Sequence, residues 1–352
     1  MAVILLAAMS AKAQKIEVVD GEGNGIPYAS VLTQEAEYIG TTDLDGVLPD
    51  AKGAKAVTIT HVAFKSKDVT LDGKDIRVTL EDADFSLPEI TVQPKPLVYV
   101  QTYYRLYVHS EKDGIVCYRA GLTDNAYDPQ KKKVSASTDH VMMAKNSIIK
   151  IAMKMFGSYL DALSHIKAGK VEDRLVKAGK EIGLTITSVA PDKKRISDNW
   201  GTIGYITDDK GAGLRRFSYD TQQIIMHQLE ARGKDKMLAK AEKIYSKRQN
   251  QTETDYTIYL IDDKGDYAPE DFVMRQSLQS YDEVSDGKTN HYVYGLQVFT
   301  IERAYVTKEE LKQRKKDNKI KMNLSNIQQF EQQHNIPPLP ASVRKAVYGM
   351  TE

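Results

Sequence analysis

The chain has 352 residues, enough for two domains that each bury a core of their own. Its 49 basic and 48 acidic side chains nearly cancel, which gives no electrostatic case for a nucleic-acid partner or an anionic membrane surface. The single cysteine, Cys117, excludes a disulfide within the chain.

Residues 1–13 have the pattern of a secretory signal peptide. Residues 3–9 form an apolar run that is too short to span a bilayer, which takes about 20 residues. Residues 11–13 (AKA) place small side chains at the two positions that a signal peptidase requires. The usual positively charged start is missing, and the alternative interpretation is a buried N-terminal strand. We expect an exported protein whose mature chain starts at Gln14 and contains no transmembrane segment.

Residues 14–93 are predicted to form an all-β sandwich. Short runs of β-forming residues are separated by Gly, Asp and Asn, which favour turns. In residues 75–80 (DIRVTL), Ile76, Val78 and Leu80 fall on one face of a strand, and the polar residues between them fall on the other. Several half-buried strands at short spacing favour a small antiparallel sandwich over a helical or βαβ domain.

Four pieces of this stretch occur in the order typical of one family. They are Val19-Asp20 with IPYASV at 26–31, GTTDLDG at 40–46, ITHVAF at 59–64 and LPEITV at 87–92. On these residues the stretch resembles the carboxypeptidase regulatory-like family, also described as transthyretin-like or peptidase-associated domains. The resemblance implies an accessory, non-catalytic module of a Gram-negative type cell envelope, periplasmic or surface-associated, with an outer-membrane protein or a glycan as its partner.

The remainder of the chain is predicted to contain a linker, a larger domain and a tail. Prolines in residues 94–97 break the β pattern and indicate the linker. Residues 98–305 are predicted to form an α+β domain, an antiparallel sheet with helices, and residues 306–352 a charged helical tail. Strands are expected at 97–108, 115–120, 184–189, 201–218, 256–261, 272–281 and 291–304, and a hairpin turn at 111–114.

Helices are expected in five parts of this remainder, the last being a short helix that ends near Tyr348. Apolar residues recur at spacings of three and four between positions 139 and 182, with Asp139 as the expected N-cap. Shorter helices are expected at 221–231 and 234–248. Residues 308–334 carry many charges and few apolar anchors, which predicts a solvated helix.

Acidic clusters raise the question of calcium. Asp43 and Asp45 begin a DLDG sequence that resembles the start of an EF-hand loop, but the twelfth position, where a bidentate Glu is needed, is Ala54. Residues 208–211 (DDKG) and 262–266 (DDKGD) each follow a predicted strand. Asp and Gly are the residues that tight turns require, so all three clusters are interpreted as turns, with a surface calcium site as the alternative.

Two further patterns could carry chemistry. His227 and Glu230 could bind zinc from one face of a helix, with His291 as a third ligand, but no general base or oxyanion donor accompanies them, so an exposed polar face is preferred. Cys117 could act with His140 or His109, but it lies in a β-like run where a buried, inert thiol is expected.

No residue is therefore assigned to catalysis, cofactor binding or a metal. The tyrosines of the predicted strand at 97–108, Tyr99, Tyr103, Tyr104 and Tyr107, suit either core packing or a binding surface. We expect a non-catalytic protein that functions in binding or assembly. The alternative is a secreted hydrolase whose active site lies in the α+β domain, in the cleft between the sheet and its helices.

Overall fold

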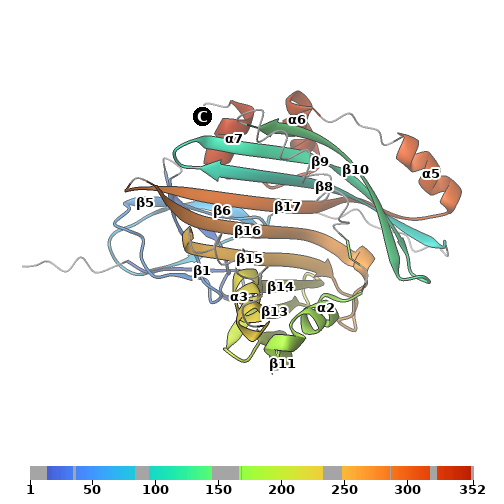
Figure 1. Cartoon of the computed structure of the whole chain (residues 1–352), viewed down its shortest axis with the longest axis horizontal. Coiled ribbons are helices and arrows are strands. Elements are labelled where there is room, and N and C mark those ends of the chain that lie inside the picture. Colours follow the sequence, from blue (N-terminus) through green and yellow to red (C-terminus); the bar gives the residue numbers. More distant parts are fainter. Residues whose placement is uncertain are drawn as a thin grey trace, which may run out of the picture. The chain divides into compact units, whose positions relative to one another are not determined.

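The computed structural model describes residues 14–34, 37–83, 95–144, 166–167, 169–232, 248–285, 287–317 and 323–349. The chain divides into two compact units, Met1–Ala83 and Asp84–Glu352. Strands predominate in both units, and the helices belong to the second (Figure 1). The predicted signal peptide, the LPEITV piece at 87–92, most of the predicted linker and most of the predicted helical stretches at 139–182 and 234–248 lie outside the described residues.

The first unit consists of two sheets that share one apolar core. One sheet has the order β4-β1-β7 and the other the order β3-β2-β5-β6. Ile16, Val31 and Val78, which come from both sheets, are buried in the same cluster. The strands are β1 (Ile16–Val19), β2 (Ser30–Thr33), β3 (Tyr38–Thr41), β4 (Val47–Leu48), β5 (Ala56–His61), β6 (Phe64–Thr70) and β7 (Ile76–Thr79).

The predicted all-β character of this unit is confirmed for its described residues, but one pairing differs from the antiparallel arrangement we expected. Strands β1 and β7 are parallel, with Ile16 opposite Ile76 and Val18 opposite Val78. Parallel neighbours need a long connection, and here that connection consists of all the other strands of the unit. Sequence spacing between adjacent strands could not reveal this pairing.

The residues of two motif pieces, IPYASV and GTTDLDG, contact each other. The Thr42 hydroxyl donates to the Ile26 carbonyl at 2.8 Å and accepts the Ala29 backbone N–H at 2.8 Å. Gly46 has a φ of +78°, and a Cβ there would lie 2.4 Å from the Val18 carbonyl oxygen, so no other residue fits without strain. The motif residues therefore hold one corner of the unit together.

The second unit is built on a ten-stranded antiparallel sheet with the order β10-β9-β8-β17-β16-β15-β14-β13-β12-β11. The predicted hairpin at 111–114 is confirmed, since it joins β8 to β9 with Gly114 at a φ of +66°. The strands are β8 (Leu97–Ser110), β9 (Gly114–Asp128), β10 (Lys133–Ala144), β11 (Thr185–Ala190), β12 (Lys193–Ser197), β13 (Thr202–Asp209), β14 (Leu214–Asp220), β15 (Arg248–Leu260), β16 (Phe272–Ser285) and β17 (Lys288–Val306).

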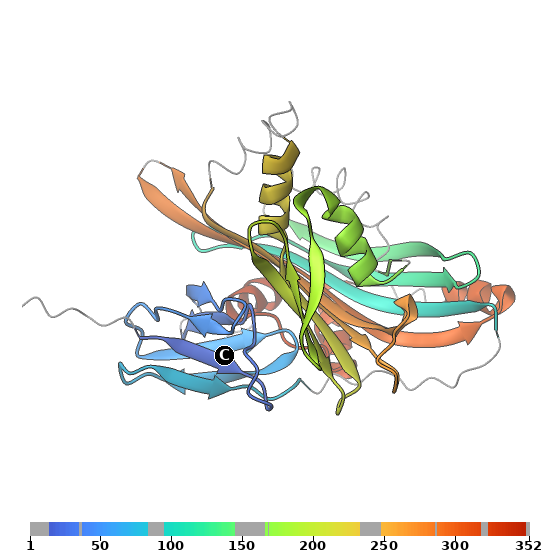
Figure 2. The same cartoon turned by 90° about the horizontal axis from the view of Figure 1, so that it is seen from below.

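Helices cover this sheet on both faces. On one face, Val100 and Tyr104 of β8 share a core cluster with residues of α2 (Val171–Ala178), the 3-10 turn η1 (Lys180–Ile182) and α3 (Thr221–Arg232). On the other, the ring of Tyr103 lies 5.3 Å from that of Phe330 in α6 (Leu324–Gln333), near α7 (Ala341–Tyr348). Because neighbouring residues of a strand point to opposite faces, the two sets of helices lie on opposite sides of the sheet (Figure 2).

Two predicted helices are corrected by the structure. Asp139 does not cap a helix, because it lies in β10 opposite Leu122, within a ladder of twelve residue pairs that overrides the local signal. Residues 308–334 do not form one solvated helix. The structure has α5 (Lys308–Asp317) and then α6, which begins at the N-cap Asn323 and buries Ile327 and Phe330 against the sheet.

The docking of α6 includes a fully buried ion pair. Arg105 of β8 donates to Glu331 at 2.8 Å and to the Gln297 amide oxygen at 2.7 Å, and its side chain is 0% exposed. The hydroxyls of Tyr103 and Tyr348 donate to the same carboxylate, at 2.7 Å and 3.0 Å. None of the helices in the described ranges is long and apolar enough to cross a membrane.

Candidate functional site

A pocket of about 200 Å³ lies on the α2 face of the large sheet. It lies where the apolar core of this face meets a group of charged side chains. It is lined by Lys167, by Val171, Arg174, Leu175 and Ala178 of α2, by Tyr219 of β14, by Asp255, Thr257 and Tyr259 of β15, and by Phe272 and Arg275 of β16.

The β-sheet register brings these residues together. Asp255, Thr257 and Tyr259 alternate along β15 and therefore share one face of it. Tyr219 of β14 is directly opposite Asp255, and Arg275 of β16 is directly opposite Thr257. On α2, the four lining residues recur at spacings of three, one and three, so a single helical face covers the pocket.

Asp255 organises the polar end of the pocket. Its side chain is 2% exposed, and its carboxylate accepts hydrogen bonds from Thr257 at 2.8 Å and from Arg275 Nε at 2.6 Å. Tyr219 bonds to the same carboxylate, and burial raises the pKa of this phenol, so it stays protonated. The negative charge of Asp255 raises the pKa of Arg275, whose side chain remains 32% exposed. Asp255 thus positions a guanidinium that can still contact a ligand.

The pocket has more cations than carboxylates. In the part of the chain that the structure describes, Lys167, Arg174 and Arg275 line it together with one carboxylate, that of Asp255, an excess of two positive charges. Arg174 bonds to the Tyr259 phenol. Burial, followed by the charges of Arg275 and Arg174, lowers the pKa of Lys167. Among the ion pairs of the described residues, that of Asp255 is with Arg275, and none joins a carboxylate to Lys167 or Arg174.

The rest of the pocket wall is apolar or aromatic. Val171, Tyr259 and Phe272 are at most 5% exposed and belong to the core cluster of this face, with Leu175 packed against it. These side chains pack against other core residues, so the shape of the pocket wall is fixed by that packing. A pocket of this kind suits a ligand that is anionic at one end and apolar at the other.

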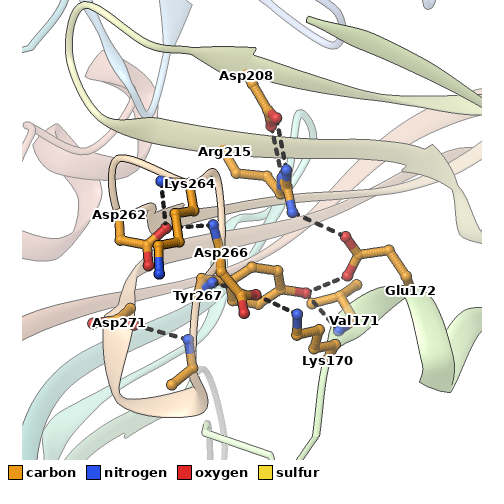
Figure 3. Close-up of polar contacts among 11 residues, drawn as sticks. Lys170, Val171, Glu172, Asp208, Arg215, Asp262, Lys264, Asp266, Tyr267 and Asp271 are labelled. Atoms are coloured by element: carbon orange, nitrogen blue, oxygen red, sulfur yellow. Dashed lines mark hydrogen bonds and ion pairs between the residues drawn. The ribbon is translucent and has the colours of Figure 1, made fainter. Parts of the chain in front are cut away.

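A polar network holds α2, one wall of the pocket, in place (Figure 3). Arg215 of β14 pairs with Asp208 through two hydrogen bonds of 2.6 Å and also contacts Glu172 of α2 at 3.3 Å. The Tyr267 hydroxyl donates to Glu172 and accepts the Val171 backbone N–H at 2.8 Å. Because bidentate arginine pairs have a defined geometry, this network fixes the first turn of α2 against the sheet.

The acidic clusters predicted as turns do form turns. The Asp43 carboxylate accepts the backbone N–H groups of Asp45 and Val47, at 3.0 Å and 2.8 Å. The Asp262 carboxylate accepts those of Lys264 and Asp266, at 3.0 Å and 2.7 Å. Among the described residues, no group of three or more His, Cys, Asp and Glu side chains is placed to hold a metal ion.

Contrary to the prediction, His227 of α3 does not lie on an exposed polar face. Its side chain is 16% exposed, its Nδ1 bonds to Asp198 at 2.5 Å, and its ring stacks on Trp200 with centroids 4.5 Å apart. The packing of α3 over the turn between β12 and β13 buries it. His291 instead bonds to Asp282 of β16 at 2.6 Å, so the structure does not bring it together with His227 and Glu230 as a zinc site.

Cys117 is buried, free and 3% exposed, and burial raises the pKa of its thiol to about 11. It therefore stays protonated and unreactive at neutral pH. The strand tyrosines Tyr99, Tyr103, Tyr104 and Tyr107 are at most 3% exposed, which confirms core packing for them.

The residues of the pocket were missed by sequence reasoning. Arg275 lies inside a predicted strand, and Asp255 lies one position before another. A charge within a strand is the signal that could have drawn attention to them, because buried charges must be paired or serve a function. The pairing of β14, β15 and β16, which places these charges side by side, cannot be read from spacing alone.

Comparisons with known proteins add little. No family model matches the chain, and no curated protein matches it. Among solved structures, one described as lipid–protein interactions in lipovitellin matches with a TM-score of 0.29 and 8% identity. The match covers 61% of this chain and 26% of that one, so the chain spans about a quarter of that protein's length. A likeness this slight does not indicate a shared fold.

Proposed function

We propose that this chain is a non-catalytic binding protein whose large-sheet unit holds a small anionic ligand in the pocket beneath α2. The observation that carries the proposal is the charge balance of that pocket. Three cationic side chains converge on one carboxylate that is already bonded to Arg275, Thr257 and Tyr219. Charge-assisted hydrogen bonds from guanidinium groups are the strong interactions by which proteins hold carboxylates and phosphates.

Binding is favoured over the alternative of a secreted hydrolase by the lining residues. The described residues among them include no serine, cysteine or histidine, the side chains that most often act as nucleophile or general base. Asp255, the lining carboxylate, is bonded to three partners and is not available as a base.

We further propose that the first unit is a transthyretin-like module of the carboxypeptidase regulatory-like family, and that the protein is exported to a Gram-negative type envelope, in the periplasm or at the surface. The support is the order of the four motif pieces and the signal-like residues 1–13. The module would contact an outer-membrane protein or a glycan through its loops or strand edges. Fractionation of a bacterial host and N-terminal sequencing test this part, with cleavage before Gln14 expected; a full-length cytoplasmic product would refute it.

Calorimetric titration of the purified protein with inorganic phosphate, sulfate and acetate tests the binding proposal. We expect saturable binding of at least one anion, weakened tenfold or more in the variant Arg174→Gln. Arg195→Gln is the matched control, because Arg195 is an exposed arginine of β12 outside the pocket. Equal losses in the two variants would contradict the proposal, and turnover of ester, peptide or glycoside substrates would replace it with the hydrolase.

A further inference from the structure

The pocket changes character along strand β15. Asp255 marks one end, shared with Tyr219 and Arg275. Tyr259 marks the other end, where its ring and that of Phe272, directly opposite, form an aromatic wall and its hydroxyl bonds to Arg174. These two positions on β15 are four residues apart, which is about 13 Å along a strand. A ligand lying along this strand would therefore have its charged group at one end and its apolar body at the other.

The volume of the pocket indicates how large an apolar body it can hold. An engineered protein cavity of about 150 Å³ accommodates benzene. A pocket of about 200 Å³ therefore accommodates one ring of that size together with a small polar group.

We propose that the pocket binds a small organic carboxylate with one ring-sized apolar body, with the carboxylate on Arg275 and Lys167 and the body between Phe272 and Leu175. This inference rests on the proposed function, since it names the ligand class of the same site. The planar guanidinium of Arg275 matches a carboxylate, and Lys167 adds a second positive charge. The faces of Phe272 and Leu175 exclude water from the body of the ligand.

Benzoate, acetate and benzyl alcohol are the probes that test this inference, measured by calorimetry on the full chain. Benzoate has both the carboxylate and the ring, and the other two probes have one each. We expect benzoate to bind at least tenfold tighter than either, because only benzoate carries both a carboxylate and a ring.

Two variants separate the ends of the pocket. Lys167→Gln should weaken benzoate and acetate by a similar factor, whereas Leu175→Ala should weaken benzoate alone. Neither side chain is fully buried, so both variants are expected to fold. Lys177→Gln, an exposed position of α2 that does not line the pocket, is the matched control and should bind as the unmodified protein does.

The possible failures are distinct. Acetate or phosphate binding as tightly as benzoate would overturn the ring-sized body and leave the anion site intact. If benzyl alcohol bound as tightly as benzoate, both the carboxylate ligand class and the proposed anion-binding function would be overturned, because the charge would then contribute nothing. The absence of binding by any anion would also overturn both.

The pH dependence offers a further check. Burial and the neighbouring charges of Arg275 and Arg174 lower the pKa of Lys167, against the opposing effect of Asp255. Above that pKa the amine is neutral and its attraction for the carboxylate is lost. Benzoate affinity should therefore fall as the pH rises, at a lower pH than the value near 10.4 of an ordinary lysine. In Lys167→Gln this dependence should be absent.

Discussion

Replacing Glu331 by glutamine tests what holds the C-terminal helices on the sheet. The carboxylate of Glu331 is the charged partner of Arg105, whose guanidinium is fully buried, and it also accepts the hydroxyls of Tyr103 and Tyr348. The amide has nearly the same size but no charge. It leaves the guanidinium with neutral acceptors, the Gln297 amide oxygen and the Pro337 carbonyl.

The expected loss of stability is large. Removing one partner of a buried ion pair costs about 3–5 kcal/mol, because the other charge remains buried and uncompensated. Since Arg105 keeps its two neutral acceptors, we expect the lower end, about 3 kcal/mol. With a urea m-value of about 3 kcal/mol/M, at the upper end for small proteins, the unfolding midpoint should fall by about 1 M.

Urea titration followed by tryptophan fluorescence measures this change. Trp200 is the single tryptophan of the chain and lies in the second unit, so its signal reports the unfolding of that unit. Glu310→Gln is the matched control, because the pair of Glu310 with Lys95 is 45% and 28% exposed and should contribute little. A midpoint for Glu331→Gln within error of that control would refute the reasoning. The double variant Arg105→Met, Glu331→Leu should regain part of the loss, since no buried charge is left over.

Three further outcomes are expected. A residue in a strained backbone conformation costs about 1–3 kcal/mol, and Gly46→Ala should destabilise the first unit by more than that because of its close backbone contacts. Gly53→Ala, at a similar φ of +73° with nothing within 4 Å, should cost the strain alone. Hydrogen exchange over residues 14–83 compares the two variants. Cys117, with its thiol pKa of about 11, is about 0.1% thiolate at pH 8. The thiol of the native protein should therefore react with a disulfide reagent at least about 100-fold more slowly than that of the protein unfolded in urea. Rapid stoichiometric labelling of the native protein would contradict the burial of Cys117. Tyr267→Phe should leave the Val171 backbone N–H without its partner, at a cost of about 1–3 kcal/mol in stability. We expect faster amide hydrogen exchange in α2. Unchanged exchange in α2 would show that the network does not hold the helix.

The N-terminal unit shows how far local patterns reach. The alternation of Val78 and Leu80 with polar neighbours predicted a half-buried strand, and both residues are at most 4% exposed. The turns at Asp43 and Asp262 were predicted because their side chains bond to their own backbone, which depends on nearby residues alone. The parallel pairing of β1 with β7 was not predicted, since it joins residues 60 positions apart.

The second unit shows where such patterns fail. Local spacing predicted Asp139 as the N-cap of a helix, but pairing with β9 makes it part of a strand. Residues 308–334 looked solvated because their charges outnumber their apolar side chains, yet Ile327, Phe330 and Glu331 are each at most 7% exposed. Glu331 is buried only because Arg105, more than 200 positions earlier, compensates its charge.

By itself, the amino-acid sequence determined that the first unit is built of strands, where the tight turns lie and that the cysteine forms no internal disulfide. These features depend on side-chain alternation, backbone hydrogen bonds to near neighbours, and composition. The tertiary structure alone decided which charges meet. Lys167, Arg174, Asp255 and Arg275 are up to 108 positions apart and share a pocket because three strands align in register beneath one helix. Charge interactions depend on distance in space, and that distance is set by packing.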